Sequence, residues 1–215
     1  MRRPARLLLL LSVGMLVPAA SAQGPEHRPV SGPEQRPAQA PASLYAPGHY
    51  LVDSAATRVH FHVKALVGSY DGDFVAPEGA VVITPEHPDR ASIDIQFPVD
   101  KLTTGDASTD AMLKGDSFFD GTKFPTIRFS AQDAPLATPD TPTAIAGELT
   151  MHGQTRPVTL SVRLAGVTPD EAPGLSVLHF TGTLSIERSQ FGMGFGRPFV
   201  SDKVDLSIDA IFHRS

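Results

Sequence analysis

The sequence contains no cysteine. This absence excludes a disulfide framework, and it excludes lipid attachment through an N-terminal cysteine. It also removes one class of catalytic nucleophile, and the Gly-x-Ser-x-Gly motif of serine hydrolases is missing as well. Any folded part of the chain must therefore be held together by its apolar core, and no motif indicates an enzyme.

Basic residues are few and scattered along the sequence. Apart from Arg2, Arg3 and Arg6, which belong to a leader considered next, 15 Lys and Arg residues stand against 23 Asp and Glu residues, a formal charge of −8. The sequence has no cluster of Lys and Arg and no basic stripe interleaved with aromatic residues. This pattern argues against nucleic acid and against anionic membrane surfaces as partners.

Long apolar runs are also missing, with one short exception near the start. Three arginines precede the apolar residues 7–17, and Ala20-Ser21-Ala22 supplies a small-residue cleavage site. These features predict a secretory signal peptide over residues 1–22, with Gln23 as the mature N-terminus of an exported protein. A membrane anchor is the alternative interpretation, but the apolar run is too short to span a bilayer.

Residues 23–48 are rich in Pro, Gly, Glu, Gln and Ala. Such a segment cannot bury enough apolar surface to offset the entropy of ordering it. We therefore expect a disordered arm that acts as a spacer, although a role in binding a partner stays open. Residues 49–215 have the length of one domain with a single core.

Within this domain, apolar residues recur at every second position between Tyr50 and Phe212, in stretches separated by Gly, Pro and Asp turns. Side chains of a strand point alternately to opposite faces, so each stretch predicts a strand with one dry face and one wet face. Strands in series leave no open edge when they close into a barrel. We predict an all-β fold, an antiparallel barrel of about eight strands, whose lumen is filled by side chains or holds one small ligand.

One short helix interrupts the strands. Asp106 can cap its start, Asp110 lies in its first turn, and Gly115 ends it. The helix has few apolar positions, so we expect it over one mouth of the barrel.

Two histidines suggest a metal site. His60 and His62 are two residues apart on the strand expected over 57–66, so they project from one face, which suits two imidazole ligands. However, no third ligand can be identified, and the histidines share their face with Arg58 and Lys64. A solvated exterior pair is the favoured interpretation, and we predict no metal and no cofactor.

The run Gly192-Met193-Gly194-Phe195-Gly196 resembles a phosphate-binding loop. That function needs a preceding strand, a following helix and a parallel sheet. Pro198 and the next expected strand provide none of these. The run is better explained as a glycine-rich bend at the rim of the barrel.

Several motifs occur in the order and spacing of the YceI-like proteins, and together they span nearly the whole expected domain. They are Leu102-Thr103-Thr104-Gly105, Asp116-Ser117-Phe118-Phe119-Asp120, Phe124-Pro125-Thr126-Ile127-Arg128-Phe129, Gly147-Glu148-Leu149-Thr150-Met151-His152-Gly153-Gln154-Thr155, Arg188-Ser189-Gln190-Phe191-Gly192-Met193 and Val200-Ser201-Asp202-Lys203-Val204. The resemblance implies an elongated, lipocalin-like barrel that is exported to the bacterial periplasm and encloses a long polyisoprenoid chain.

On this basis we expect a carrier or storage protein for a long isoprenoid lipid, with an isoprenoid quinone among the candidates. A ligand-free secreted module that binds another protein is the alternative, and an enzyme built in the same lumen is a weaker third hypothesis. Transient contact with a membrane and a homodimer both stay open. The residues expected to line the lumen and bind the ligand are Phe61, Val63, Phe118, Phe119, Phe129, Leu149, Phe180, Phe191, Met193 and Phe195.

The leader generates a prediction about export. In its native host the protein should begin at Gln23, because a signal peptidase cleaves after the small residues that end at Ala22. N-terminal sequencing of the purified protein checks this. Recovery of a chain that begins at Met1 would contradict it.

Overall fold

A computed structural model of the protein describes residues 45–169 and 176–215. The predicted signal peptide and the arm up to residue 44 lie outside the described residues. Residues 45–48, which we assigned to the disordered arm, belong to the folded domain, because the side chain of Tyr45 is buried in its core. The boundary predicted at residue 49 was therefore a few residues too late.

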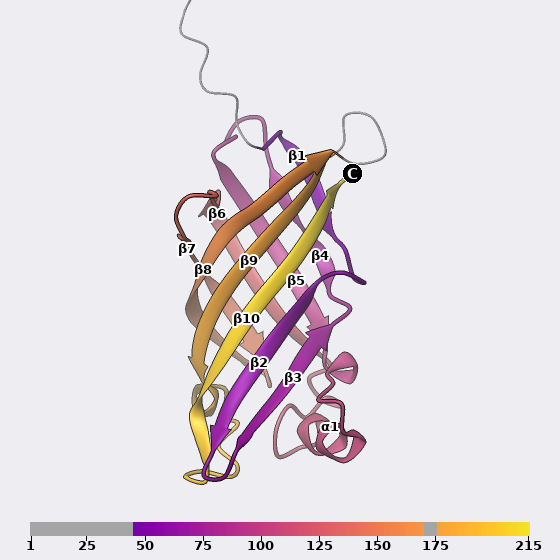
Figure 1. Ribbon diagram of the computed structural model, residues 1–215, viewed down its shortest axis with the longest axis vertical. Coiled ribbons are helices and arrows are strands. Elements are labelled where there is room, and N and C mark those ends of the chain that lie inside the picture. The colour runs from indigo at the N-terminus through magenta and orange to yellow at the C-terminus, as the bar shows by residue number, and fades with distance from the viewer. Residues whose placement is uncertain (1–44, 170–175) are drawn as a thin grey trace, which may run out of the picture. The chain divides into compact units, whose positions relative to one another are not determined.

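The strands pair with one another in an antiparallel manner throughout (Figure 1). Their order in the sheet is β1-β4-β5-β6-β7-β8-β9-β10-β2-β3, and β10 also pairs with β1. The strands are β1 (Gly48–Val52), β2 (Arg58–Ala65), β3 (Ser69–Val75), β4 (Glu78–Ile83), β5 (Arg90–Pro98), β6 (Thr126–Pro135), β7 (Thr143–Met151), β8 (Gln154–Pro169), β9 (Ser176–Glu187) and β10 (Val200–Arg214).

The long strand β10 closes the barrel. Its end pairs with β1, where Val52 lies opposite Phe212, and the rest of it pairs with β2, where Arg58 lies opposite Asp209. Strands β1 and β2 are thus two halves of one interrupted strand. Strands β4 and β3, which pair with β1 and β2 respectively, form a second such strand. With each interrupted strand counted once, the barrel has eight strands, and the predicted all-β antiparallel barrel is confirmed.

The alternation of apolar residues sets which face of each strand points inward. On β2, Phe61 and Val63 are buried, while His60 and Lys64 are exposed on the outer face. On β8, Val162 and Leu164 are buried in the same way. The inward register predicted for these strands is therefore confirmed.

One end of the barrel carries the irregular segments, and we call it the lower end, as drawn in Figure 1. The 3-10 helix η1 (Val99–Lys101) and helix α1 (Ala107–Lys114) connect β5 to β6 there, and the 3-10 helix η2 (Arg188–Phe191) follows β9. The carboxylate of Asp106 accepts a hydrogen bond of 2.7 Å from the backbone N–H of Thr109. The predicted cap of α1 is thus confirmed.

The segment between β5 and β6 also completes the barrel wall. Strand β3 has no ladder with β5, because β5 pairs with β4 instead. In place of a ladder, the backbone groups of Asp73 and Thr103 exchange two hydrogen bonds of 2.8 and 3.0 Å. Among the described residues, no helix is long and apolar enough to cross a bilayer.

Gly79 generates a prediction about the start of β4. Its φ is +125°, and a Cβ added there would overlap the backbone carbonyl oxygen of Asp94 on β5. The substitution Gly79→Ala should lower the free energy of unfolding by at least about 2 kcal/mol, because both strain and overlap oppose the side chain. Urea titration followed by circular dichroism measures this loss.

The matched control is Gly166→Ala on β8, where an added Cβ meets nothing within 4 Å. This variant should stay within about 0.5 kcal/mol of the unmodified protein. Equal losses at both glycines would contradict the interpretation of Gly79.

Candidate functional site

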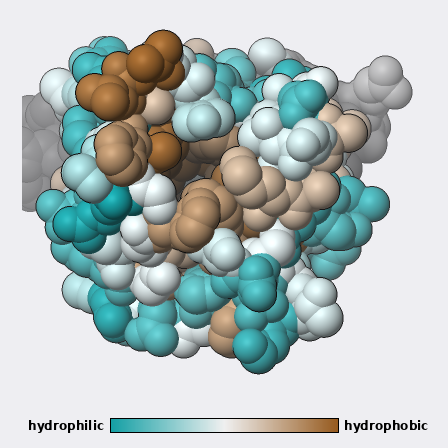
Figure 2. Space-filling view, turned by 90° about the horizontal axis from the view of Figure 1, so that it is seen from below, coloured by the Kyte–Doolittle hydropathy of each residue, from teal (hydrophilic) through white to brown (hydrophobic). Residues whose placement is uncertain are grey.

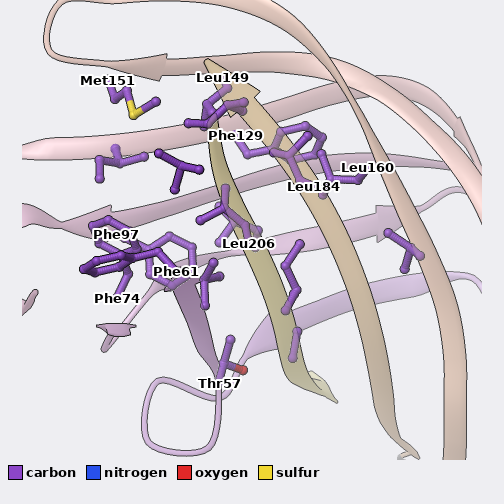
Figure 3. Close-up of a pocket in the computed structure, with 18 of the residues that line it drawn as sticks. Thr57, Phe61, Phe74, Phe97, Phe129, Leu149, Met151, Leu160, Leu184 and Leu206 are labelled. Carbon is purple, nitrogen blue, oxygen red and sulfur yellow. The ribbon is translucent and has the colours of Figure 1, made fainter. Parts of the chain in front are cut away.

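A cavity of about 350 Å³ runs along the inside of the barrel. This volume lies in the range of small-molecule binding sites. Figure 3 shows apolar side chains from β2, β3, β5, β6, β7, β8, β9 and β10 converging on it. Every wall of the barrel thus contributes to the lining.

Phenylalanines crowd the part of the cavity near β2 and β3. The ring of Phe74 lies 5.4 Å from that of Phe61, 6.5 Å from that of Phe97 and 5.6 Å from that of Phe119, measured between centroids. Tilted and edge-on contacts at these distances are favourable for aromatic pairs. They hold the wall together on the side of β3 that has no ladder.

The buried polar groups in the lining already have partners within the protein. The hydroxyl of Thr57 donates to the carbonyl of Ile211 and accepts from its N–H, at 3.2 and 2.9 Å. The hydroxyl of Tyr45 donates to the carbonyl of Ala137. Within residues 45–169 and 176–215, no buried side-chain nitrogen or oxygen lacks a hydrogen bond. The lumen therefore suits an apolar molecule and offers little to a polar one.

Among the described residues, Arg188 is the one charged residue in the lining, and it is buried. Its guanidinium donates to four backbone carbonyls, those of Met193, Phe195, Val200 and Ser201, at 2.6 to 3.0 Å. Burial lowers the pKa of Arg188, and the nearby carboxylate of Asp202 acts in the opposite direction. Arg188 thus organises the glycine-rich bend from inside, which explains that bend without a phosphate ligand.

The cavity reaches the surface at the lower end. Six large apolar side chains gather there with 44 % to 90 % of their surface exposed, and we call them the apolar rim: Leu66, Val67, Tyr70, Met112, Phe195 and Phe199. Figure 2 shows hydrophobic residues around a hollow at this end. The N–H of Leu66 donates to the carbonyl of Phe199 at 2.7 Å, which ties two parts of the rim together.

Nine of the ten residues predicted to line the lumen do so, and their role in binding a ligand stays a prediction. Phe191 is the exception, because it is buried in the core of the lower end without facing the cavity. Phe195 lies at the mouth with 60 % of its surface exposed, so its predicted inward orientation was only partly right. The nine are Phe61, Val63, Phe118, Phe119, Phe129, Leu149, Phe180, Met193 and Phe195.

Most of the apolar rim was missed from the sequence. Leu66 and Val67 stand directly before the turn at Gly68, where polar residues are usual. Two bulky apolar residues at such a position were a signal that could have revealed an exposed patch. Tyr45 was missed too, although it is an isolated aromatic residue at the end of a Pro-rich segment.

His60 and His62 lie on the outside of the barrel, as predicted. Their ring Nδ1 atoms lie 3.1 Å from a carboxylate oxygen of Asp73 and 2.6 Å from one of Asp71, respectively. The hydrogen bond with His62, followed by one from Ser69, lowers the pKa of Asp71. In the described part of the chain, no three His, Cys, Asp or Glu side chains are arranged to hold a metal ion.

Comparison with known proteins places this barrel in a family. The sequence profile of the YceI-like domain matches residues 50–212. This chain belongs to the YceI-like domain family. A relative from Pseudomonas fluorescens, a UPF0312 protein, is 28 % identical over 172 residues, which cover 74 % of this chain and 83 % of the relative.

Two solved structures resemble this YceI-like chain in fold. Burkholderia cenocepacia BcnA superposes with a TM-score of 0.61 at 24 % identity, over 74 % of this chain and 98 % of BcnA. A polyisoprenoid-binding domain from Saccharophagus degradans superposes with a TM-score of 0.56 at 13 % identity, over 79 % of this chain and all of that domain. At these identities the likeness establishes the fold.

Arg188 generates a prediction about the lower end. The substitution Arg188→Met should lower the free energy of unfolding by about 3 kcal/mol or more, because it leaves four carbonyls without their donor. Arg188→Lys should recover only part of this loss, since an ammonium group cannot match the planar fork of a guanidinium. Chemical denaturation of both variants measures the effect.

Arg163→Met serves as the control, because Arg163 is exposed and its hydrogen bonds to other described residues are long, at 3.4 and 3.5 Å. We expect it to change stability by no more than about 0.5 kcal/mol. If Arg188→Met were equally harmless, Arg188 would not organise the bend.

Proposed function

We propose that this protein is an exported carrier or storage protein for a long isoprenoid lipid, with isoprenoid quinones among the candidates. The observation that carries the proposal is a closed barrel whose cavity is lined mainly by apolar side chains, while the buried side-chain polar atoms of the described residues are already hydrogen-bonded. Such a lumen offers few hydrogen bonds to a polar ligand, which would lose its bonds to water on entry. It shields the enclosed part of an apolar chain from water.

The free energy of burying an apolar chain determines where such a carrier can take up and release its lipid. Burying one five-carbon unit from water is worth about 3 to 4 kcal/mol. A chain of several units therefore soon exceeds the ceiling of about −20 kcal/mol for non-covalent affinity. The relevant donor and acceptor are bilayers, whose interior is as apolar as the lumen. Selection between lipids then rests on the fit of the chain to the cavity.

Two further observations support the ligand class. The solved domain from Saccharophagus degradans is described as binding polyisoprenoids, and it shares the fold of this chain. In addition, the cavity is not filled by side chains, which argues against a ligand-free module. The lining offers no nucleophile beside a base, so we propose a binding protein and not an enzyme.

The apolar rim suggests where exchange takes place. Phe195 and Met112 belong both to the rim and to the lining of the cavity. An apolar chain that leaves through this mouth stays in contact with apolar side chains. We therefore propose that the rim touches a membrane transiently in the periplasm, with the headgroup of the lipid held at the mouth.

Native mass spectrometry of protein purified without added lipid tests this function. We expect a bound hydrophobic mass that organic solvent removes and that has the fragments of a prenyl chain. Repeated absence of any bound mass, in protein from the native host, would favour a ligand-free interaction module.

A pair of variants separates the lumen from the outer histidines. Leu184→Trp adds bulk to a side chain that points into the middle of the cavity (Figure 3). It should reduce bound lipid to less than half, at a stability cost of about 1 to 3 kcal/mol from overpacking. Lipid extracted and weighed against folded protein gives the measurement.

The double variant His60→Ser with His62→Ser is the control. Both histidines lie on the outer face, so lipid content should stay unchanged, and chelators should have no effect. If the histidine variant lost its lipid while Leu184→Trp kept it, the ligand would be held by a polar or metal site on the outside, contrary to the proposed function.

A further inference from the structure

The end of the cavity opposite the apolar rim is occupied by Tyr45, Leu136 and Ala137. Tyr45 retains only 4 % of its surface exposed, and its hydroxyl donates to the carbonyl of Ala137. Its ring stacks on that of Phe180, with centroids 6.2 Å apart and planes 1° apart. Phe180 in turn meets Phe212 edge-on at 5.8 Å. The three rings stand together at this end of the lumen.

The backbone around Tyr45 is fixed by two further contacts. The hydroxyl of Tyr50 donates to the carbonyl of Ala46 at 2.6 Å, and the guanidinium of Arg214 donates to the carbonyl of Pro47 at 2.7 Å. Tyr50 itself is fully buried. Each of the three residues before β1 is thus tied to the barrel, and burial raises the pKa of Tyr45, which keeps its hydroxyl protonated as a donor.

We propose that Tyr45 is the floor of the cavity and sets the longest prenyl chain that the barrel holds. A chain that enters tail first through the rim meets the Tyr45 ring at the far end. The headgroup does not follow it inward, because no buried side-chain polar atom of the described residues is left unpaired to receive it. Units beyond the floor must then stay outside the mouth. This inference rests on the proposed function and deepens it.

Tyr45 lies outside the part of the chain that the family model matches. The family profile begins at residue 50, so the floor is supplied by the segment that precedes the matched domain. A change at residue 45 alters the lumen without replacing a residue of any strand.

The test uses the full-length protein, freed of lipid and incubated with phosphatidylcholine vesicles that carry an equimolar mixture of polyprenols of three to eleven isoprene units. Bound polyprenols are extracted and their lengths are measured by mass spectrometry. For Tyr45→Ala we expect the most abundant bound length to increase by at least one isoprene unit. Tyr45→Phe keeps the ring and loses only the hydroxyl, so its length profile should match that of the unmodified protein.

A variant with the opposite effect covers the case in which Tyr45→Ala does not fold. Ala137→Leu adds bulk at the floor and should shift the profile to shorter chains. Identical length profiles for folded Tyr45→Ala and Ala137→Leu would overturn the floor while leaving lipid binding intact. Failure of the unmodified protein to take up any polyprenol would overturn the proposed function and the floor together.

Discussion

Closure of the hydrogen-bonded sheet is the constraint on which the rest of the molecule depends. Strand β10 achieves it by pairing with β9 on one side and with both β1 and β2 on the other. With no free edge left between these strands, every inward side chain is enclosed, and the alternation along each strand becomes a continuous apolar lining. Since the chain has no disulfide, this lining and the ladders around it must supply the stability.

Much of this could be predicted from local pattern. Period two along β2 assigns Phe61 and Val63 to the inside and His60 to the outside, because a slip by one residue would reverse all of them. The capping of α1 by Asp106 and the turn before Gln154 are equally local. Fold class and most of the cavity lining follow from such features.

What could not be predicted depends on contacts distant in sequence. The burial of Tyr45 results from partners 92 and 135 residues away, Ala137 and Phe180, so its composition-based assignment to the arm was wrong. From the sequence alone, a charged residue such as Arg188 is expected on the surface. Its burial follows from hydrogen bonds to the backbone carbonyls of the bend that comes after it. The apolar rim likewise forms only in the folded protein, because its residues come from the turn after β2, from helix α1 and from the bend after η2, which lie together at one end of the barrel.

The seam beside β3 has a mechanical consequence. Around most of its circumference, the barrel can widen only by breaking ladder hydrogen bonds, which are directional and short. Beside β3, one isolated bridge between Asp73 and Thr103 is the only backbone pairing between strand β3 and the segment that follows β5, within the described residues. Cohesion there comes from the rings of Phe74, Phe97 and Phe119, whose contacts tolerate sliding. The wall thus has a compliant strip beside β3. There the circumference of the barrel can adjust to a bulkier ligand while the hydrogen bonds of the remaining sheet stay intact.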